Sequence, residues 1–301
     1  MFDTLNSKAA LLAPSSSLKE NDLTAARSFL SSSGIESIDS AHLFSRERFL
    51  AGSDSERSAD INAAFSDTDI ALIFTVRGGY GAMRVLDKLD YDLISQNKKL
   101  LFGLSDSSAL QLALASQANL KSFSGLSLTY DLKKDQQLSP KIRDCFNSIL
   151  KNEVYTETDF ESFEALEIEG RVYASCLTLL ASLCGSPYIP DLRDSILIIE
   201  DVKEEPYRID RMIQQLKLSG HLQSLKALIF GAFNGCTSKD PGDGSMMELV
   251  ADWNKQLDCP VIYNFPYGHI KDRVIIPVGG HLKIAKETIF IYPETDQLTI
   301  N

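Results

Sequence analysis

The sequence predicts an α/β protein of two domains, with a mainly parallel sheet in at least the first half. Two observations predict this fold class. Short apolar runs of strand length alternate with turns and helical patterns, as is typical of α/β sheets. The chain also has 301 residues, of which 44% are hydrophobic, and this is more apolar material than one typical core holds.

Six apolar runs form the expected strands: residues 9–13, 70–76, 100–104, 196–199, 227–230 and 261–264. Near the carboxyl end, residues 282–285 and 288–292 flank a short polar turn and predict a β-hairpin. Residues 131–140 are polar, and residues 153–169 are acidic without clear periodicity. The connection between the domains is therefore expected there.

Two helices can be predicted from their ends and their periodicity. Ser139 and Pro140 supply an N-cap and a first-turn proline for a helix that runs to about residue 150. A second helix has apolar residues at i, i+3, i+4 and i+7 from Ile209, and Gly220 follows as a stop.

The composition limits the possible partners and compartments. A formal net charge of −11 argues against nucleic-acid binding, which needs clustered Lys and Arg, and favours a small-molecule or peptide partner. The run at residues 9–13 is too short for a signal peptide or a membrane span, so we expect a cytoplasmic protein without a membrane partner. The cysteines are odd in number, lack a Cys-x-x-Cys pair and are interpreted as small buried hydrophobes: Cys145, Cys176, Cys184, Cys236 and Cys259.

The segment Gly-Leu-Ser-Asp at residues 103–106 links an apolar strand to a helical pattern. Such a turn would lift Ser105 out of the sheet at a helix amino terminus, where free backbone N–H groups can bind an oxyanion. This is the arrangement of a nucleophile elbow, although Ser107 replaces the second glycine of the Gly-x-Ser-x-Gly pattern. On the local pattern alone, a helix N-cap is the commoner role for Ser105 or Asp106.

A serine nucleophile needs an imidazole as its base, and the chain has four histidines. His269 follows an apolar strand, so it is expected on a loop where the sites of α/β proteins gather. Glu200 ends another apolar strand and is a candidate for the carboxylate that orients the imidazole, although a solvated acidic loop explains its pattern equally well. His42 and His221 fit structural roles, and His281 begins the predicted hairpin.

The glycine-rich segment Arg-Gly-Gly-Tyr-Gly at residues 77–81 follows a predicted strand, and its glycines allow backbone N–H groups to approach a ligand closely. The spacing of a dinucleotide loop is not met, because Met83 and Arg84 stand where a third glycine would fall. A second oxyanion donor is the better interpretation. The sequence has no His-Glu-x-x-His motif and no histidine pair with helical ligand spacing, so no metal site is predicted.

Taken in order along the chain, these segments resemble the LD-carboxypeptidase family, which includes the microcin-immunity peptidases. The resemblance spans nearly the whole chain. It rests on Ala-Pro-Ser at 13–15, Leu-Ala-Gly-Ser-Asp at 50–54 with Arg57, Ala59 and Asp60, Arg-Gly-Gly-Tyr-Gly at 77–81, Gly-Leu-Ser-Asp at 103–106, Glu-Asp at 200–201 with Tyr-Arg-Ile-Asp-Arg at 207–211, and Pro-Tyr-Gly-His at 266–269.

The resemblance implies a metal-independent serine carboxypeptidase that needs no cofactor. Ser105 would be the nucleophile, His269 the general base and then acid, and Glu200 the orienting carboxylate. Backbone N–H groups of Gly79 and Asp106 would form the oxyanion hole.

The resemblance also implies how the domains divide the site. A doubly wound amino-terminal domain (residues 1–135) would carry the nucleophile, and a β-rich α/β carboxyl-terminal domain (residues 166–301) the acid and the histidine. Residues 136–165 would connect them, so the triad would assemble across the interface. Relatives suggest a homodimer.

The implied substrate is a murein tetrapeptide, cleaved at the L,D bond to its terminal D-alanine during peptidoglycan recycling. A cation should meet the substrate's terminal carboxylate, and Arg77 or Arg84 is a candidate on position alone. Tyr80 belongs to the same loop and is a further substrate-binding candidate.

Two segments depart from the family and are expected to shape the substrate pocket. Many relatives have a histidine where this chain has Phe-Ser-Gly at 123–125, and this makes Ser124 a substrate-binding candidate. Relatives often have Gly-Gly-Asn where this chain has Ala-Ser-Cys at 174–176.

Two alternative functions stay open at this point. One is a microcin-immunity type peptidase that cleaves an aminoacyl-nucleotide or acyl-sulfamoyl peptide conjugate. The other is a non-catalytic binding protein, in which residues 78–81 cradle a ligand and Ser105 caps a helix. A nucleotide-dependent oxidoreductase is a more distant alternative.

Overall fold

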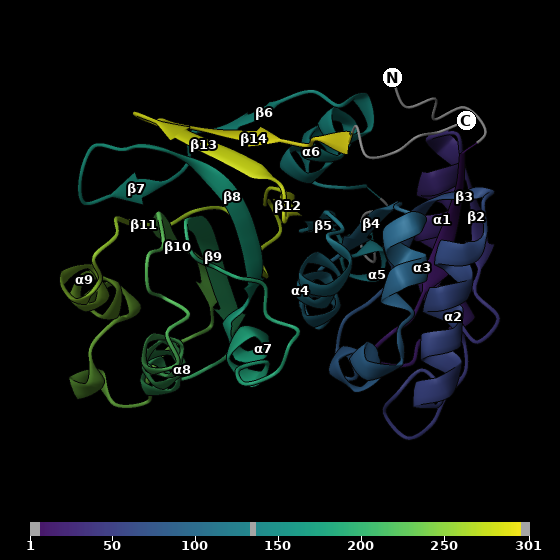
Figure 1. The fold of residues 1–301 in the computed structure, drawn as a ribbon, viewed down its shortest axis with the longest axis horizontal. Helices are drawn as coiled ribbons and strands as arrows, with labels where there is room; N and C mark the ends of the chain where they lie inside the picture. Colours follow the sequence, from purple (N-terminus) through teal and green to yellow (C-terminus); the bar gives the residue numbers. More distant parts are fainter. Residues whose placement is uncertain (1–6, 133–136, 296–301) are drawn as a thin grey trace.

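A computed structural model shows the fold and describes residues 7–132 and 137–295 (Figure 1). It confirms the predicted α/β class, with two sheets that are each accompanied by helices. The predicted end of the first domain, residue 135, and the predicted start of the connecting segment, residue 136, lie outside the described residues. The predicted domain limits therefore stay predictions.

Within the described residues, the first sheet has six strands in the order β12-β5-β4-β3-β1-β2, and only the β12–β5 pair is antiparallel. The parallel strands β1, β3 and β4 are short runs of mostly buried apolar residues, as expected when helices cover both faces of a sheet. The strands are β1 (Ser7–Leu12), β2 (Ile35–Asp39), β3 (Ile70–Thr75), β4 (Leu100–Gly103), β5 (Ser122–Ser124) and β12 (Ile276–Val278).

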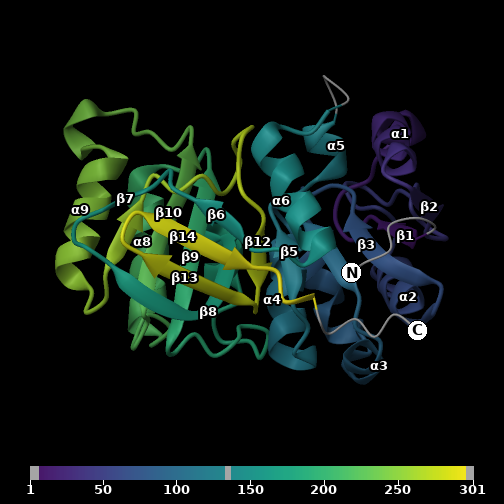
Figure 2. The same cartoon turned by 90° about the horizontal axis from the view of Figure 1, so that it is seen from above.

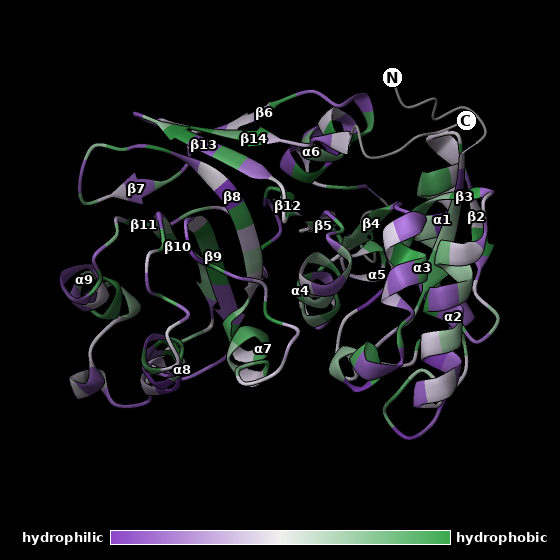
Figure 3. Cartoon of the chain, viewed as in Figure 1, coloured by the Kyte–Doolittle hydropathy of each residue, from purple (hydrophilic) through white to green (hydrophobic). Residues whose placement is uncertain are grey.

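The second sheet, over the same described ranges, has eight strands in the order β6-β14-β13-β8-β9-β10-β11-β7. Its central strands β8 to β11 are parallel, and the outer strands pair antiparallel. Figure 3 shows hydrophobic residues along the central strand β9. The strands are β6 (Tyr155–Glu157), β7 (Glu161–Ser162), β8 (Glu167–Cys176), β9 (Ser195–Val202), β10 (Ala227–Asn234), β11 (Val261–Tyr263), β13 (His281–Ala285) and β14 (Thr288–Tyr292).

The helices of the first half are η1 (Glu20–Leu23), α1 (Thr24–Ser32), α2 (Asp54–Ser66), η2 (Ala82–Lys88), α3 (Tyr91–Gln96), α4 (Ser107–Ala118) and α5 (Leu128–Asp131). Those of the second half are α6 (Pro140–Lys151), α7 (Leu177–Ser182), α8 (Pro206–Leu218), η3 (Pro241–Asp243) and α9 (Met246–Gln256).

Helix α4 contacts β4 and β5 on one side and β8 and α7 on the other, so it lies between the halves (Figure 2). Most of its residues are buried, as fits a helix packed on two sides.

The two halves also share a sheet and an ion pair. Strand β12 comes late in the chain, yet it pairs with β5 of the first sheet, with Ile276 opposite Ser124. Close to it in sequence, the fully buried Arg273 donates from Nη2 to both oxygens of Asp131 at 2.7 Å. Its Nε donates to the Gly125 carbonyl at 2.8 Å. A buried charge is stable only when it is paired in this way, so these contacts fix the returning segment.

The predicted elements are confirmed, with ends that shift by a few residues. The six predicted strands are β1, β3, β4, β9, β10 and β11, and the hairpin is β13–β14. The two predicted helices are α6, whose N-cap Ser139 accepts from the Ile142 N–H, and α8. The acidic segment without periodicity carries β6 and β7, which pair only at the edges of the second sheet. Within the described ranges, no helix has both the length and the apolar composition needed to cross a membrane.

Candidate active site

Ser105 lies in the turn between β4 and α4, as the sequence predicts. Its φ of 68° falls in the left-handed region, which residues with a side chain seldom adopt outside strained functional turns. The glycine-rich loop packs against this turn: a Cβ on Gly78 would lie 2.7 Å from the Ser105 Cβ and 2.9 Å from its Oγ. A glycine is therefore required at residue 78 for the loop backbone to reach the serine.

The side chain of Asp106 joins the nucleophile turn to two other loops. Its Oδ2 accepts hydrogen bonds from the Ser15 hydroxyl at 2.6 Å and from the Ala82 backbone N–H at 2.7 Å. Burial raises the pKa of this carboxyl, and the hydrogen bonds oppose the rise. Although Asp106 stands at the N-cap of α4, its side chain makes no capping hydrogen bond. The N-cap role that the local pattern suggested for Asp106 is therefore wrong for its side chain.

A buried arginine ties the same loops together from helix α2. Arg57 Nη1 donates to the Gly81 carbonyl at 2.9 Å and also to the Pro14 carbonyl. Its Nη2 donates to Asp54. Arg84 donates to both oxygens of Asp54, at 2.9 and 2.7 Å. The three motif segments that precede Ser105 in the sequence thus form one polar network beneath the nucleophile.

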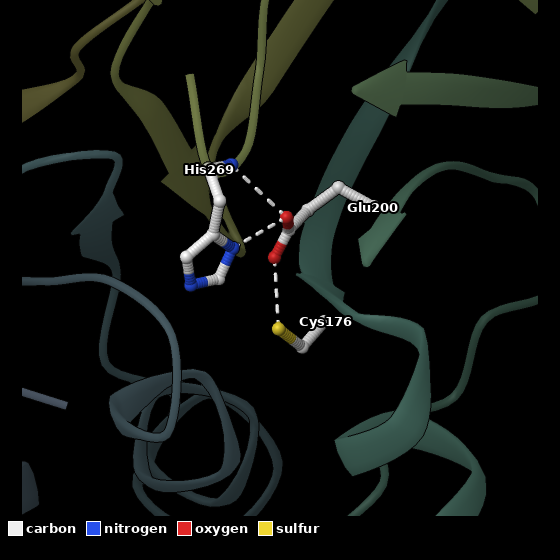
Figure 4. Close-up of side chains that lie close together, drawn as sticks. All are labelled: Cys176, Glu200 and His269. Carbon is white, nitrogen blue, oxygen red and sulfur yellow. Dashed lines mark hydrogen bonds and ion pairs between the residues drawn. The ribbon is translucent and has the colours of Figure 1, made fainter. Parts of the chain in front are cut away.

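Glu200 and His269 form a hydrogen-bonded pair at the end of β9 (Figure 4). Glu200 Oε2 lies 2.7 Å from His269 Nδ1 and accepts the His269 backbone N–H at 3.1 Å. An ionised carboxylate only accepts hydrogen bonds, so Nδ1 carries the ring proton and Nε2 is left as an acceptor. The Glu200 side chain is 1% exposed and that of His269 14%, so the carboxylate is buried behind the ring.

Gly268 explains why a glycine precedes the histidine. Its φ is 116°, and a Cβ there would lie 2.6 Å from Glu200 Oε2. Any larger residue would push the loop away from the carboxylate and break the contact with His269. The Pro-Tyr-Gly-His segment is therefore shaped by the approach of its backbone to Glu200.

A cavity of about 480 Å³ has walls from both halves of the chain and brings the candidates together. Its walls include Gly78, Gly79, Arg77, Ser105 and His269. Among the described residues, no hydrogen bond joins the Ser105 hydroxyl to the His269 ring. Such contacts are often long in the free enzyme and tighten when substrate binds.

The three predicted substrate-binding residues differ in their positions. Arg77 is in the cavity wall, and its Nη1 donates to the Ser17 carbonyl at 2.6 Å. Tyr80 is 52% exposed and meets Phe49 edge to face, with ring centroids 5.5 Å apart. Ser124 is fully buried, with its Oγ 2.7 Å from the Tyr267 hydroxyl. Their substrate contacts stay a prediction.

Two family models match most of the chain. The model described as the LD-carboxypeptidase N-terminal domain matches residues 9–125, and that of the LD-carboxypeptidase C-terminal domain matches residues 169–284. The chain belongs to the LD-carboxypeptidase family. The resemblance seen in its sequence motifs is thereby confirmed, and the family models place Ser105 in the first matched region and Glu200 and His269 in the second.

Two relatives match this member of the LD-carboxypeptidase family over nearly their whole length. A probable murein peptide carboxypeptidase of Bacillus subtilis is 30% identical over 289 residues, which is 93% of this chain and 90% of the relative. The murein tetrapeptide carboxypeptidase of Pseudomonas aeruginosa is 27% identical over 92% of this chain and 93% of the relative.

Solved structures agree with this assignment. The muramoyltetrapeptide carboxypeptidase of Oxalobacter formigenes has a TM-score of 0.86 at 32% identity, over 94% of this chain and 97% of that one. The microcin C7 self immunity protein MccF, solved with aspartyl sulfamoyl adenosine, has a TM-score of 0.86 at 22% identity, over 96% of each chain. This second likeness shows a common fold.

In this LD-carboxypeptidase chain, Cys176 is a site residue that the sequence interpretation missed. It is buried, as predicted, but its Sγ donates to Glu200 Oε1 at 2.8 Å (Figure 4). Residues 176 and 200 are direct partners in the β8–β9 pairing, which puts both side chains on one face of the sheet. The available signal was the departure at residues 174–176, where relatives often have Gly-Gly-Asn.

The rings of His42 and His281 are hydrogen-bonded to carboxylates that lie outside the cavity wall. His42 Nδ1 lies 2.8 Å from Asp60, and His281 Nε2 lies 2.9 Å from Glu169. For His42 this agrees with the structural role that the sequence indicated.

Proposed function

We propose that this chain is a serine-type, metal-independent LD-carboxypeptidase that removes the terminal D-alanine from murein tetrapeptides in peptidoglycan recycling. The observation that carries the proposal is that His269, hydrogen-bonded to Glu200, lies in the wall of the same cavity as Ser105. Membership of the peptidase family and the names of its relatives support the substrate class.

In the proposed mechanism, Ser105 is the nucleophile, His269 transfers the proton, and Glu200 stabilises the charged ring. Ser105 Oγ attacks the carbonyl carbon of the L,D bond while His269 Nε2 takes the hydroxyl proton. The imidazolium, stabilised by Glu200, returns this proton to the departing D-alanine amine. Water then attacks the acyl-enzyme with His269 again as base, and Ser105 is released with its proton restored.

The oxyanion of each tetrahedral intermediate would be bound by two backbone N–H groups. Neither the Gly79 N–H nor the Asp106 N–H donates a hydrogen bond to another described residue. Both belong to segments that the Asp106 and Arg57 network holds in place. Fixed donors of this kind stabilise developing charge without reorganising during the reaction.

Arg77 is the better of the two candidates for the substrate's terminal carboxylate. It lies in the cavity wall, whereas Arg84 is already engaged by both oxygens of Asp54. The guanidinium of Arg77 makes a single hydrogen bond to the Ser17 carbonyl in the described residues, so further N–H groups can bind a carboxylate.

The proposed setting follows from the composition and the family. The net charge of −11 supports a peptide rather than a nucleic-acid substrate. We propose that the enzyme acts in the cytoplasm. We also propose that it needs no cofactor and forms a homodimer, as the resemblance implies. Light scattering of the purified chain tests the dimer.

The deciding experiment replaces the nucleophile. Ser105→Ala should lower the rate of D-alanine release from a murein tetrapeptide by roughly 10⁴-fold or more, because no other group can form the acyl-enzyme. The melting temperature of the variant serves as the control for folding. Release at a near wild-type rate by a folded Ser105→Ala protein would rule out the proposal.

Two further measurements separate the alternatives. A fluorophosphonate should label Ser105 in the wild-type protein but not in the His269→Ala protein, whereas a silent binding protein would not be labelled. A chelator should leave the activity unchanged. Turnover of an aminoacyl-sulfamoyl nucleoside conjugate faster than that of the murein tetrapeptide would instead assign the microcin-immunity activity.

A further inference from the structure

Cys176, Glu200 and His269 bring three different metal-ligating groups to one point. A thiol sulfur, a carboxylate oxygen and a ring nitrogen all lie within 4.8 Å of one another, and no other such group occurs in the described part of the chain. We propose that these three side chains form an inhibitory binding site for a soft divalent cation, Zn²⁺ or Cd²⁺. The inhibition rests on the proposed function, whereas the binding of the ion does not.

A tetrahedral ion would need the ligand atoms to move slightly apart. With bond lengths of about 2.0–2.3 Å, the ligands of zinc lie roughly 3.3–3.8 Å apart. Here Sγ lies 2.8 Å from Oε1, and Nδ1 lies 2.7 Å from Oε2. Both contacts would need to open by about an ångström or less. The strand pairing of residues 176 and 200 and the bond from the His269 N–H to Glu200 already orient the three groups.

The donor set selects the kind of ion. Thiolate and imidazole are ligands for zinc, cadmium and copper(I), whereas Mg²⁺ and Ca²⁺ prefer sites made of oxygen alone. A relative with asparagine at this position would offer an amide in place of the sulfur. The soft ligand is therefore a property of this chain's own residue at position 176.

Binding of the ion would displace protons from the thiol and from the ring nitrogen. In the free protein the Cys176 thiol and His269 Nδ1 each carry a proton that is directed at Glu200. When the ion binds, the thiol proton leaves to solvent, and the ring proton moves from Nδ1 to Nε2. One proton is therefore released for each ion bound. The thiol is buried, and the positive charge of the ion offsets the cost of forming the thiolate there.

This exchange explains why the ion would inhibit. Once Nδ1 is a ligand, Nε2 carries the proton and can no longer accept one from Ser105. Glu200 is occupied as well and no longer orients the ring. The His269 side chain is partly exposed in the cavity wall, so an ion would enter from the side on which substrate binds.

The test is a Cd²⁺ titration of the reduced, chelator-treated protein, followed by the ultraviolet absorbance of the cadmium–thiolate bond. Wild type should bind one ion per chain, release about one proton per ion and lose D-alanine release with the same midpoint. Cys176→Ser and Cys176→Ala should lose the absorbance, and inhibition relative to their own basal rates should need about 10-fold more Cd²⁺ or more. The matched control is Cys184→Ser, which changes the more exposed thiol and should behave as wild type.

The metal site, the inhibition and the proposed function can each be contradicted separately. Loss of the absorbance in Cys184→Ser, or its persistence in both folded Cys176 variants, would overturn the site. Binding that depends on Cys176 but leaves D-alanine release unchanged would overturn the inhibition. If the wild-type protein releases no D-alanine at all, the proposed function fails, and the absorbance titration still decides the metal site.

Discussion

The two halves of the molecule fix their parts of the site in different ways. In the second half, Glu200 and His269 are joined directly at 2.7 Å, and Gly268 allows the loop to approach the carboxylate. In the first half, Ser105 is held indirectly, by a left-handed backbone and by the Asp106 carboxylate under its turn. Changes in the second half should therefore affect proton transfer, whereas changes in the first half should affect the position of the nucleophile.

The largest expected effect breaks the direct contact of the second half. In Glu200→Gln, the amide can donate to Nδ1 and so favour the wrong ring tautomer. We expect kcat to fall by roughly 10²–10⁴-fold with a nearly unchanged melting temperature. Steady-state kinetics of D-alanine release measure this. A loss below about 10-fold would show that the carboxylate is not needed to orient the base.

A second prediction concerns the ion pair that joins the halves. Arg273→Met leaves Asp131 buried without its partner and should reduce the free energy of unfolding by about 3–5 kcal/mol. Denaturant unfolding measures the loss. The double variant Arg273→Met with Asp131→Leu should recover part of it, because no unpaired charge remains. A double variant as unstable as the single one would contradict this account.

A third prediction weakens the indirect support of the nucleophile. The buried Asp106 carboxyl accepts from Ser15 and Ala82, and Asp106→Asn replaces one of its two acceptor oxygens with a donor. The turn should shift, lowering kcat by about 10–100-fold with a smaller change in KM. The rate of fluorophosphonate labelling should fall in parallel. A fall in melting temperature with unchanged kcat would mean a purely structural role.

The smallest effect is a pH dependence confined to the first half. The hydrogen bond that the His42 ring donates to Asp60 raises the pKa of His42 above its usual 6.5, and burial opposes this. Because the folded pKa is the higher one, this stabilisation is complete below pH 6.5 and is lost as the pH rises through the folded value. His42→Gln should therefore reduce the difference in melting temperature between about pH 5.5 and about pH 9. An identical pH dependence in both proteins would exclude His42 as its source.

The sequence predicted those features that depend on local pattern. Apolar runs marked the strands that precede Ser105, His269 and Glu200, so their places at strand ends follow from the strands themselves. Features set by distant pairing were missed. The contact of Cys176 with Glu200 depends on the register of β8 and β9, which no local pattern encodes. The side-chain partners of Asp106 lie 91 and 24 residues away.

The return of β12 to the first sheet has a consequence for cutting the chain. A fragment that ends before this strand would leave the backbone N–H and C=O groups of β5 unpaired at an open sheet edge. Open edges of this kind recruit strands from other molecules. A nucleophile-bearing fragment produced by itself should therefore aggregate, and supplying residues 270–280 as a separate peptide should restore its solubility.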